Sequence, residues 1–419
     1  MKNNFRFDLS DRLIHFFRDV NQLGDSAIAF PEHMGWQNLS EGTRLPASFL
    51  LRAALRNGRL WATWSYRNGE RTIFGPNPAV CFTDMPIAAF LEAGQMRRAN
   101  GEAMSPLALV FPKEPLHQFG ARPALYGLSD NIRPPAGING GPRLFPESAL
   151  AMNEQFRYIS HVYGDAKTVD WTHEREWRWP YRGDYDSVDV YAEKHGGSVS
   201  NWYDIPGLDF YQYGFEGIGA IVESARQAEL VVSDMLTLID NGVAGKNTFG
   251  FVLVSDQLSS PQALRDPHRL NDEIGNSTIR LEPYFSLSAS KCRDYERRFS
   301  ELVSNVESQA GPASDGQYGG CWLWLHDNKA PLTRALLQTG RIIVTRDGRY
   351  LAHLHELWDA RGLRERQDMT RQLAKLVWRE FETSSCYYSV QGSDRPDAIP
   401  SYSDDVDYEI GFFNCSWHR

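Results

Sequence analysis

Four segments of the first 255 residues carry side chains that could do chemistry. They are an apolar run around His15, a polar loop with Arg67 and Arg71, the turn from Cys81 to Pro86, and the Trp-rich run Asp170–Trp179, which holds Glu174 and Glu176. A carboxylate can stabilise developing positive charge or accept a proton. The planar fork of an arginine matches a phosphate group.

Each segment also has a structural interpretation. A histidine in an apolar run is more often a core residue than a ligand, and arginines in loops are mostly solvated. The charges between Glu174 and Arg178 could form ion pairs on an exposed strand face, with Trp177 and Trp179 packed on the core. The order and spacing of the segments therefore matter more than any one of them.

The elements that must position these residues alternate along the chain. Pro near the start and Gly58 at the end predict a helix over 46–57, and the AVCFT run predicts a buried strand over 79–83. We further expect strands at 60–64, 107–111, 121–126, 175–179, 219–223 and 249–255, and helices at 85–98, 146–163 and 229–240.

Composition changes at Asp256, where a polar stretch rich in Ser, Pro and Asp extends to about residue 278. Beyond it, the pattern predicts helices at 288–305, 331–338 and 361–381, a strand at 321–325, a hairpin at 341–354 and an acidic tail at 394–409. The Asp347-Gly348 pair supplies the positive φ that a tight hairpin turn needs. We expect an α+β protein with a first domain at 1–255 and a smaller α+β recognition domain at 256–419.

The arrangement in residues 10–255 resembles the DarT-type ADP-ribosyltransferases and related bacterial abortive-infection proteins. The likeness rests on the early His15 strand, the helix SFLLRAALRNGRL, the arginine loop, the VCFTDMP turn and the EREWRW strand. The resemblance implies a split mixed sheet with flanking helices and transfer of ADP-ribose from NAD, as in a toxin–antitoxin or anti-phage system.

The resemblance also implies roles for individual residues. Glu176 and Arg71 match the catalytic positions, with Glu174 and Arg67 as the competing choices, while His15, Phe17, Arg67 and Tyr66 match NAD-binding positions. Breaking the bond between nicotinamide and ribose passes through an oxocarbenium-like state, which a carboxylate stabilises. Trp64 could stack on a base, although core packing is its alternative role.

A nucleic-acid base in single-stranded DNA or RNA is the acceptor that the resemblance implies. Residues 52–71 hold five arginines and one glutamate, and residues 341–379 hold nine basic and five acidic residues. Such patches can follow a phosphate backbone, and they can equally be solvated helix faces. An antitoxin or chaperone protein is a further expected partner.

Overall composition restricts the function classes. The chain has 44 basic and 53 acidic side chains, a net charge of −9, so it lacks a global basic footprint. Its five cysteines are scattered without a CxxC pair, which argues against a zinc knuckle or disulfide framework and favours the cytosol. No signal peptide, membrane span, metal motif or Rossmann glycine pattern is expected.

Two alternatives remain at this point. The chain could be a catalytically silent relative that acts as an immunity or sensor module, as Phe17 stands where the family often has Thr. It could also be a transferase with a protein acceptor, which the negative net charge favours. NAD binding separates the first alternative from an enzyme.

Overall fold

The computed structural model describes the ranges 10–21, 44–67, 70–100, 104–129, 134–136, 141–162, 169–183, 206–260, 269–313 and 316–404, with residues 132, 266 and 406. Two compact units divide the chain. Unit 1 comprises Met1–Val231 and Asn247–Ile279, and unit 2 comprises Val232–Lys246 and Arg280–Arg419. The units do not coincide with the segments 1–255 and 256–419 expected from composition, because a helix and an edge strand cross that boundary.

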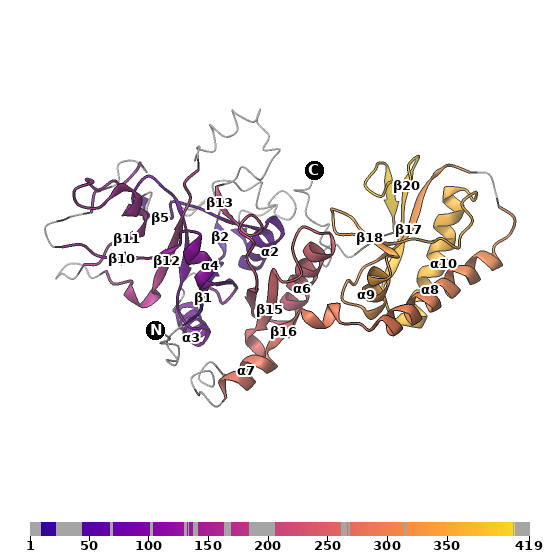
Figure 1. Ribbon diagram of the computed structural model, residues 1–419, viewed down its shortest axis with the longest axis horizontal. Helices are drawn as coiled ribbons and strands as arrows, with labels where there is room; N and C mark the ends of the chain where they lie inside the picture. Colours follow the sequence, from indigo (N-terminus) through magenta and orange to yellow (C-terminus); the bar gives the residue numbers. More distant parts are fainter. Residues whose placement is uncertain are drawn as a thin grey trace. The chain divides into compact units, whose positions relative to one another are not determined.

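A mixed eight-stranded sheet forms the centre of unit 1 (Figure 1). Its strands, in spatial order, are β16 (Thr278–Arg280), β15 (Phe249–Val254), β14 (Ile218–Val222), β8 (Ala108–Pro112), β1 (Arg12–Phe16), β7 (Ala79–Thr83), β12 (Glu176–Pro180) and β9 (Arg122–Pro123). Strands β14 and β15 are parallel, whereas β8, β1, β7 and β12 pair antiparallel with their neighbours. The α+β class is therefore confirmed.

Short ribbons and helices surround this sheet. The ribbons pair β2 (Val20–Asn21) with β3 (Arg44–Leu45), β4 (Arg59–Trp61) with β13 (Gly207–Asp209), β5 (Tyr66–Arg67) with β6 (Glu70–Arg71), and β10 (Leu125–Tyr126) with β11 (Tyr158–Ile159). The helices are α2 (Ala47–Asn57), α3 (Ile87–Ala99), α4 (Lys113–Gln118), α7 (Leu270–Asn276) and the start of α6 (Ala225–Asp240).

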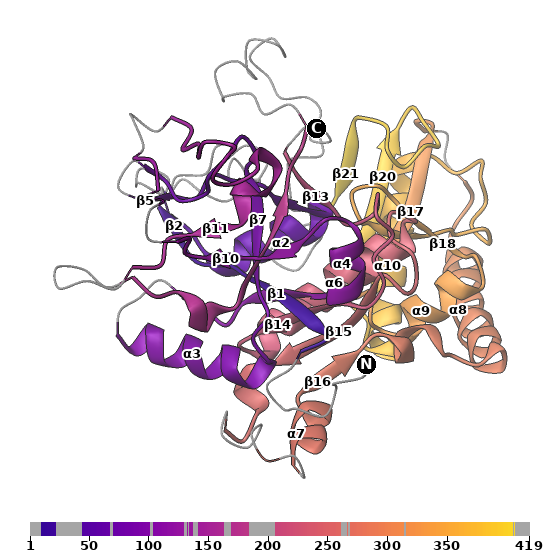
Figure 2. The same cartoon turned by 60° about the vertical axis from the view of Figure 1, so that its left-hand side comes forward.

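The two faces of the sheet carry different cores. On one face, Phe90 and Leu91 of α3 belong to the same buried cluster as Ile14 of β1 and Val110 of β8; α3 is the helix at the lower left of Figure 2. The other face is aromatic: the ring of Phe111 contacts those of Phe82, Phe210 and Phe215 at centroid distances of 5.8, 5.2 and 5.7 Å. Alternation along each strand therefore decides which core a side chain joins.

Several expected elements are confirmed in unit 1. Helix α2 begins after Pro46 and ends at Gly58, whose φ of 60° closes the helix in the left-handed region. Strand β7 has the predicted bounds.

The helix expected over 146–163 is wrong. A 3₁₀ turn at Met152–Arg157 leads into β11 instead. The fully buried Gln155 side chain bonds the backbone of Phe145 and Leu150, which draws the chain into a compact turn before a helix can extend.

Unit 2 is a five-stranded sheet with helices on one face (Figure 1). Its strands, in spatial order, are β18 (Ile342–Val344), β19 (Tyr350–Ala352), β17 (Gly319–Leu325), β20 (Ser385–Gln391) and β21 (Ser401–Ser403). Helices α8 (Ala289–Gln309), α9 (Pro331–Gln338) and α10 (Leu363–Phe381) share a core with Leu323 and Leu325 of β17. The Asp347-Gly348 hairpin is confirmed, with Gly348 at φ 80°.

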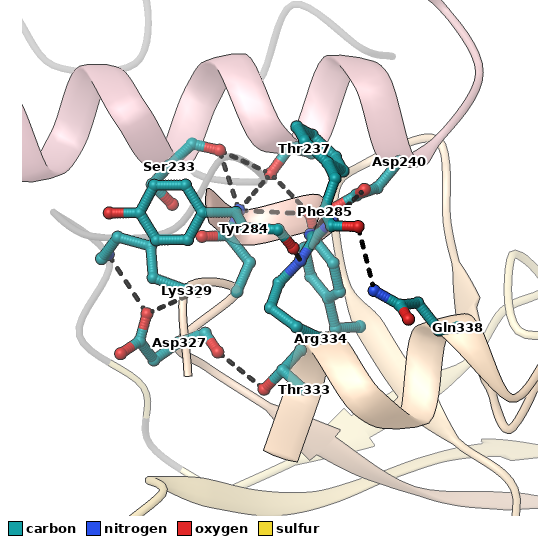
Figure 3. Close-up of polar contacts among 12 residues, drawn as sticks. Ser233, Thr237, Asp240, Tyr284, Phe285, Asp327, Lys329, Thr333, Arg334 and Gln338 are labelled. Carbon is teal, nitrogen blue, oxygen red and sulfur yellow. Dashed lines mark hydrogen bonds and ion pairs between the residues drawn. The ribbon is translucent and has the colours of Figure 1, made fainter. Parts of the chain in front are cut away.

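The C-terminal half of α6 is bound into unit 2 by buried polar contacts (Figure 3). Arg334 of α9 donates two hydrogen bonds to the Asp240 carboxylate, and both side chains are only 3% exposed. The Tyr350 hydroxyl donates to Asp240 at 2.7 Å, and the Asn328 amide donates to the Ser233 carbonyl at 2.9 Å. This part of α6 therefore contributes a buried, paired charge to a unit whose other residues begin at Arg280.

Candidate functional site

The candidate site of unit 1 lies where β12 begins. Residues directly opposite each other in antiparallel strands point to the same face. Glu176 lies opposite Thr83, and Arg178 lies opposite Cys81. These four side chains therefore form one polar group on the face of the sheet that also carries Ile14, which lies opposite Thr83 on the other side.

The Glu176 carboxylate is held by a buried arginine. Arg178 Nε donates to Glu176 Oε1 at 2.6 Å, and the two side chains are 5% and 15% exposed. Arg178 Nη1 also donates to the carbonyls of Phe156 and Tyr158, at 2.8 and 3.1 Å. Burial has the largest single effect and would lower the pKa of Arg178, but the charge and hydrogen bond of Glu176, together with Cys81 and Tyr126, raise that pKa overall. The pair is therefore not the exposed ion pair that the sequence pattern also allowed.

Two weak acids lie beside this carboxylate. The Glu176 backbone N–H donates to the Tyr126 hydroxyl at 2.7 Å. Burial, with the charge of Glu176 as a further cause, raises the pKa of Tyr126 to about 12. Burial and then the charge of Glu176 raise the pKa of Cys81 well above its ordinary value. Both groups therefore keep their protons at neutral pH, and Cys81 is unsuited to act as a thiolate nucleophile.

Glu174 and Glu176 occupy different environments. Glu174 ends a 3₁₀ turn, Thr172–Glu174, and its carboxylate pairs with Arg97 of α3 at 2.8 Å. Arg175 has φ 47° and ψ 49°, and this left-handed residue separates the turn from the strand. Because alternation is broken there, the two glutamates are not equivalent strand positions, and only Glu176 belongs to β12.

Arg71 lies on the side of the sheet that carries Glu176. Its guanidinium carbon lies 4.1 Å from the centre of the Trp64 ring, a cation–π contact. Trp64 belongs to a buried cluster with Phe156, against which Cys81 packs. Packed side chains therefore connect Arg71 to the Glu176 group. The competing Arg67, with Tyr66, lies in β5, and the side chains of these two residues lie outside the described part of the structure.

His15 and Phe17 lie on the other face. The His15 ring contacts Phe17 at a centroid distance of 5.0 Å and Phe82 at 5.8 Å. Phe82 alternates with Cys81 and Thr83, so its side chain points away from theirs. The structure therefore does not bring His15 and Phe17 together with Glu176 on one face of the sheet.

The bonding of His15 explains what it does in this position. Its Nδ1–H donates to the Cys81 carbonyl at 2.8 Å, which links β1 to β7. Burial lowers the pKa of His15 to about 4 despite that hydrogen bond. The ring is consequently neutral at physiological pH, with the proton on Nδ1.

Sequence reasoning missed four members of the Glu176 group. Cys81, Thr83 and Arg178 lie in the quoted motifs, yet no role was assigned to them, and Tyr126 was seen only as part of a strand. The usable signal is the register between AVCFT and EWRWP, which sets Cys81 opposite Arg178. Tyr126 lies in β10, and its local sequence gives no sign of its hydrogen bond with the Glu176 backbone.

The described ranges contain neither a metal-binding cluster nor a membrane-spanning helix. Within them, no group of three or more His, Cys, Asp or Glu side chains is arranged to hold a metal ion. Of the helices in those ranges, none is long and apolar enough to cross a membrane.

Comparison with known families gives one match. Residues 287–415 match a family described as a protein of unknown function (DUF4427). No curated protein and no solved structure matches the chain. The family match falls within unit 2, so it bears on α8, α9, α10 and their sheet and does not extend to the Glu176 group.

Proposed function

We propose that unit 1 is an NAD-dependent ADP-ribosyltransferase that modifies a base of single-stranded DNA or RNA, with Glu176 as its catalytic carboxylate. The observation that carries the proposal is the Glu176 group itself. The Glu176 carboxylate is only 15% exposed and lies at the first residue of β12 in the central sheet. Arg178 holds it by a hydrogen bond, and Tyr126 lies beside it. The resemblance of residues 10–255 to DarT-type enzymes supports the same assignment.

The proposed step balances without a metal ion. The bond between the nicotinamide nitrogen and ribose C1′ breaks, and neutral nicotinamide leaves with the bonding electrons. Glu176 stabilises the positive charge that develops on the ribose. A nitrogen or oxygen of the acceptor base then bonds to C1′, and its proton passes to Glu176 as general base.

Arg71 is proposed to hold the pyrophosphate of NAD. Its guanidinium carbon lies 4.1 Å from the centre of the Trp64 ring, which positions the side chain near the Glu176 group, and the planar fork of an arginine matches phosphate oxygens. His15 is given no contact with NAD in this proposal. Its contribution is to hold β1 against β7 through the Cys81 carbonyl, which supports the strand next to β12.

A host-defence role follows from the proposed chemistry. Modification of nucleic-acid bases would arrest replication or translation, so the protein is proposed to act as a toxin in the cytoplasm of an infected bacterium. An antitoxin or chaperone protein would keep it silent beforehand. This role predicts poor tolerance of expression that Glu176→Gln relieves.

A catalytically silent binding module is the second candidate, and one observation favours it. His15 and Phe17, which the resemblance places at NAD, lie on the face opposite Glu176. Such a module would bind neither NAD nor an acceptor through the Glu176 group.

Transfer from labelled NAD tests the proposal. Wild type, Glu176→Gln and Glu174→Gln are incubated with single-stranded DNA, RNA and a cell protein extract in separate reactions. Glu174→Gln is the matched control, since it removes the same charge two residues away, from a carboxylate paired with Arg97. We expect label on nucleic acid with wild type and the control, and its loss in Glu176→Gln.

Two measurements keep that outcome interpretable. Thermal unfolding of each variant shows whether unit 1 stays folded when Arg178 lacks its charge partner. Calorimetric titration with NAD separates binding from transfer. Absence of both NAD binding and transfer in folded wild type would favour the silent module, and label on protein alone would move the acceptor to a protein side chain.

A further inference from the structure

We infer that one face of α10 in unit 2 binds single-stranded nucleic acid; this inference rests on the proposed function and names the surface that receives its acceptor. The face is a stripe formed by Arg364, Lys375, Arg379 and Trp378, which we call the α10 stripe. Residues 364, 375 and 379 fall within about 60° of one another around the helix axis at 100° per residue. All three cations are exposed.

The cations of the stripe differ from two basic side chains near them, Arg361 and Arg371. Arg371 pairs with Asp368 and Asp404 and lies over the Tyr387 ring, and Arg361 pairs with Glu307 and Glu365. Across the described residues of both units, the side chains of Arg364, Lys375 and Arg379 have no hydrogen bond, ion pair or ring contact. Their charge is therefore available to an external anion.

The acids of α10 do not cancel this charge. Glu365 is bound by Arg361, Glu380 by Arg298, and Asp368 by Arg371. Since each helix acid already has a cationic partner, the stripe remains a net positive surface on a protein of charge −9.

Trp378 adds a stacking platform to the stripe. It is 58% exposed, unusual for a large aromatic residue, and it lies between Lys375 and Arg379 along the helix. Interleaved cations and an exposed aromatic ring are what a single strand requires, because its phosphates are anionic and its unstacked bases present flat faces. A duplex hides those faces, so the ring favours a single strand.

A hollow of about 700 Å³ adjoins the N-terminal part of the stripe. Residues of α10 line one side of it (Arg364, Glu365, Asp368, Met369 and Gln372), and the other lining residues are Ala310, Gly311, Gly316, Gln317 and Gly362. Gly316 and Gly362 are so close that a Cβ on either would lie 2.7–2.8 Å from the other's Cα. The hollow is polar and large enough for an unstacked base beside Arg364.

The length of the stripe sets the extent of the contact. Arg364 and Arg379 are fifteen residues apart, which is about 22 Å at the helical rise of about 1.5 Å per residue. That span accommodates a few nucleotides of extended strand, with one end at the hollow and the other at Trp378. The stripe lies within the segment 287–415 that matches the family of unknown function.

Binding of fluorescent 20-nucleotide single-stranded DNA and RNA to the full chain, measured by anisotropy over a salt series without NAD, tests the inference. The test variant is Lys375→Ala/Arg379→Ala, and the matched control is Lys291→Ala/Arg293→Ala, which removes two exposed charges from α8. We expect the slope of log affinity against log salt to fall by about 1.4 in the test variant, at about 0.7 per phosphate contact, and to stay unchanged in the control.

Trp378→Ala tests base stacking separately from general charge attraction, because it changes no charge. We expect it to weaken binding at least about fivefold with no change of slope, because stacking does not release counterions. No binding at low salt, equal losses in test and control variants, or binding of an acidic peptide in place of the oligonucleotides would overturn the inference.

The two proposals fail separately. Oligonucleotide binding that depends on the stripe, without any transfer from NAD, counts against the proposed function alone. Transfer to the same oligonucleotides that the stripe variants leave undiminished counts against the stripe alone. Circular dichroism of each variant confirms that α10 is intact.

Discussion

Replacing Asp240 by Asn removes a single negative charge from the most deeply buried ion pair in the described part of unit 2. The Asp240 carboxylate accepts two hydrogen bonds from Arg334 and one from Tyr350, and both charged side chains are 3% exposed. Asn has nearly the same shape, so packing is retained while the Arg334 charge loses its partner (Figure 3).

The magnitude follows from the burial. Breaking a buried ion pair on one side costs about 3–5 kcal/mol, because the remaining charge stays desolvated. Arg334 keeps a hydrogen bond from Nε to the Tyr284 carbonyl and a contact over the Phe285 ring, which favours the lower end of that range. For a unit of this size the loss corresponds to a fall in Tm of roughly 6–20 °C.

Hydrogen exchange followed by mass spectrometry is the suitable assay, since it reports unit 2 separately from unit 1. Peptides of α9 and β19 in Asp240→Asn should exchange at least tenfold faster than in wild type. The matched control is Asp294→Asn, which removes the same charge from an exposed pair with Arg297 and should change stability by less than about 1 kcal/mol. Equal effects of the two substitutions would refute the reasoning.

Three further outcomes are expected in unit 1. Gly58→Ala should lower the free energy of unfolding by about 2–5 kcal/mol in urea, because left-handed strain adds to overpacking by a Cβ that would lie 2.1 Å from the Tyr211 ring. Gly214 has the same φ of 60° but lies in open space, so Gly214→Ala should lower it by only about 1–2 kcal/mol, and equal losses would exclude the clash. The pKa of His15 is lowered from 6.5 to about 4, so the unfolded chain binds more protons than the folded chain below pH 6.5. The free energy of unfolding should therefore be highest above pH 6.5 and fall as the pH drops towards 4, with a smaller dependence in His15→Gln, and an imidazole that titrates near 6.5 by NMR would contradict this. Arg71→Gln should raise KM for NAD about tenfold or more with little change in kcat, and an unchanged KM would remove Arg71 from the pyrophosphate site.

Local elements with strong chemical signals were predictable from the sequence. Pro46 and Gly58 bound α2, Pro331 starts α9, and Asp347-Gly348 makes the hairpin of unit 2, each because one residue type restricts the backbone. The helix expected over 146–163 failed because a single buried amide, Gln155, competes with helical hydrogen bonding. No periodicity reveals such a contact.

The candidate site was predictable only in part. Glu176 and Arg71 were chosen from motifs, and the structure connects them through Trp64 and Cys81. The sequence could not predict to which face of the sheet His15 points, because that depends on the register between β1 and β7. The division into units was hidden for a related reason: the pairing of Asp240 with Arg334 joins residues 94 positions apart.

Transfer of labelled ADP-ribose to single-stranded DNA and RNA by Glu176→Gln and Glu174→Gln, at equal folded concentration, tests the central claim most directly. The account predicts that wild type and Glu174→Gln label the nucleic acid and that Glu176→Gln loses at least about a hundredfold in rate, as expected for removal of a catalytic base. Equal rates in the two variants, or loss in Glu174→Gln alone, would contradict the assignment of Glu176.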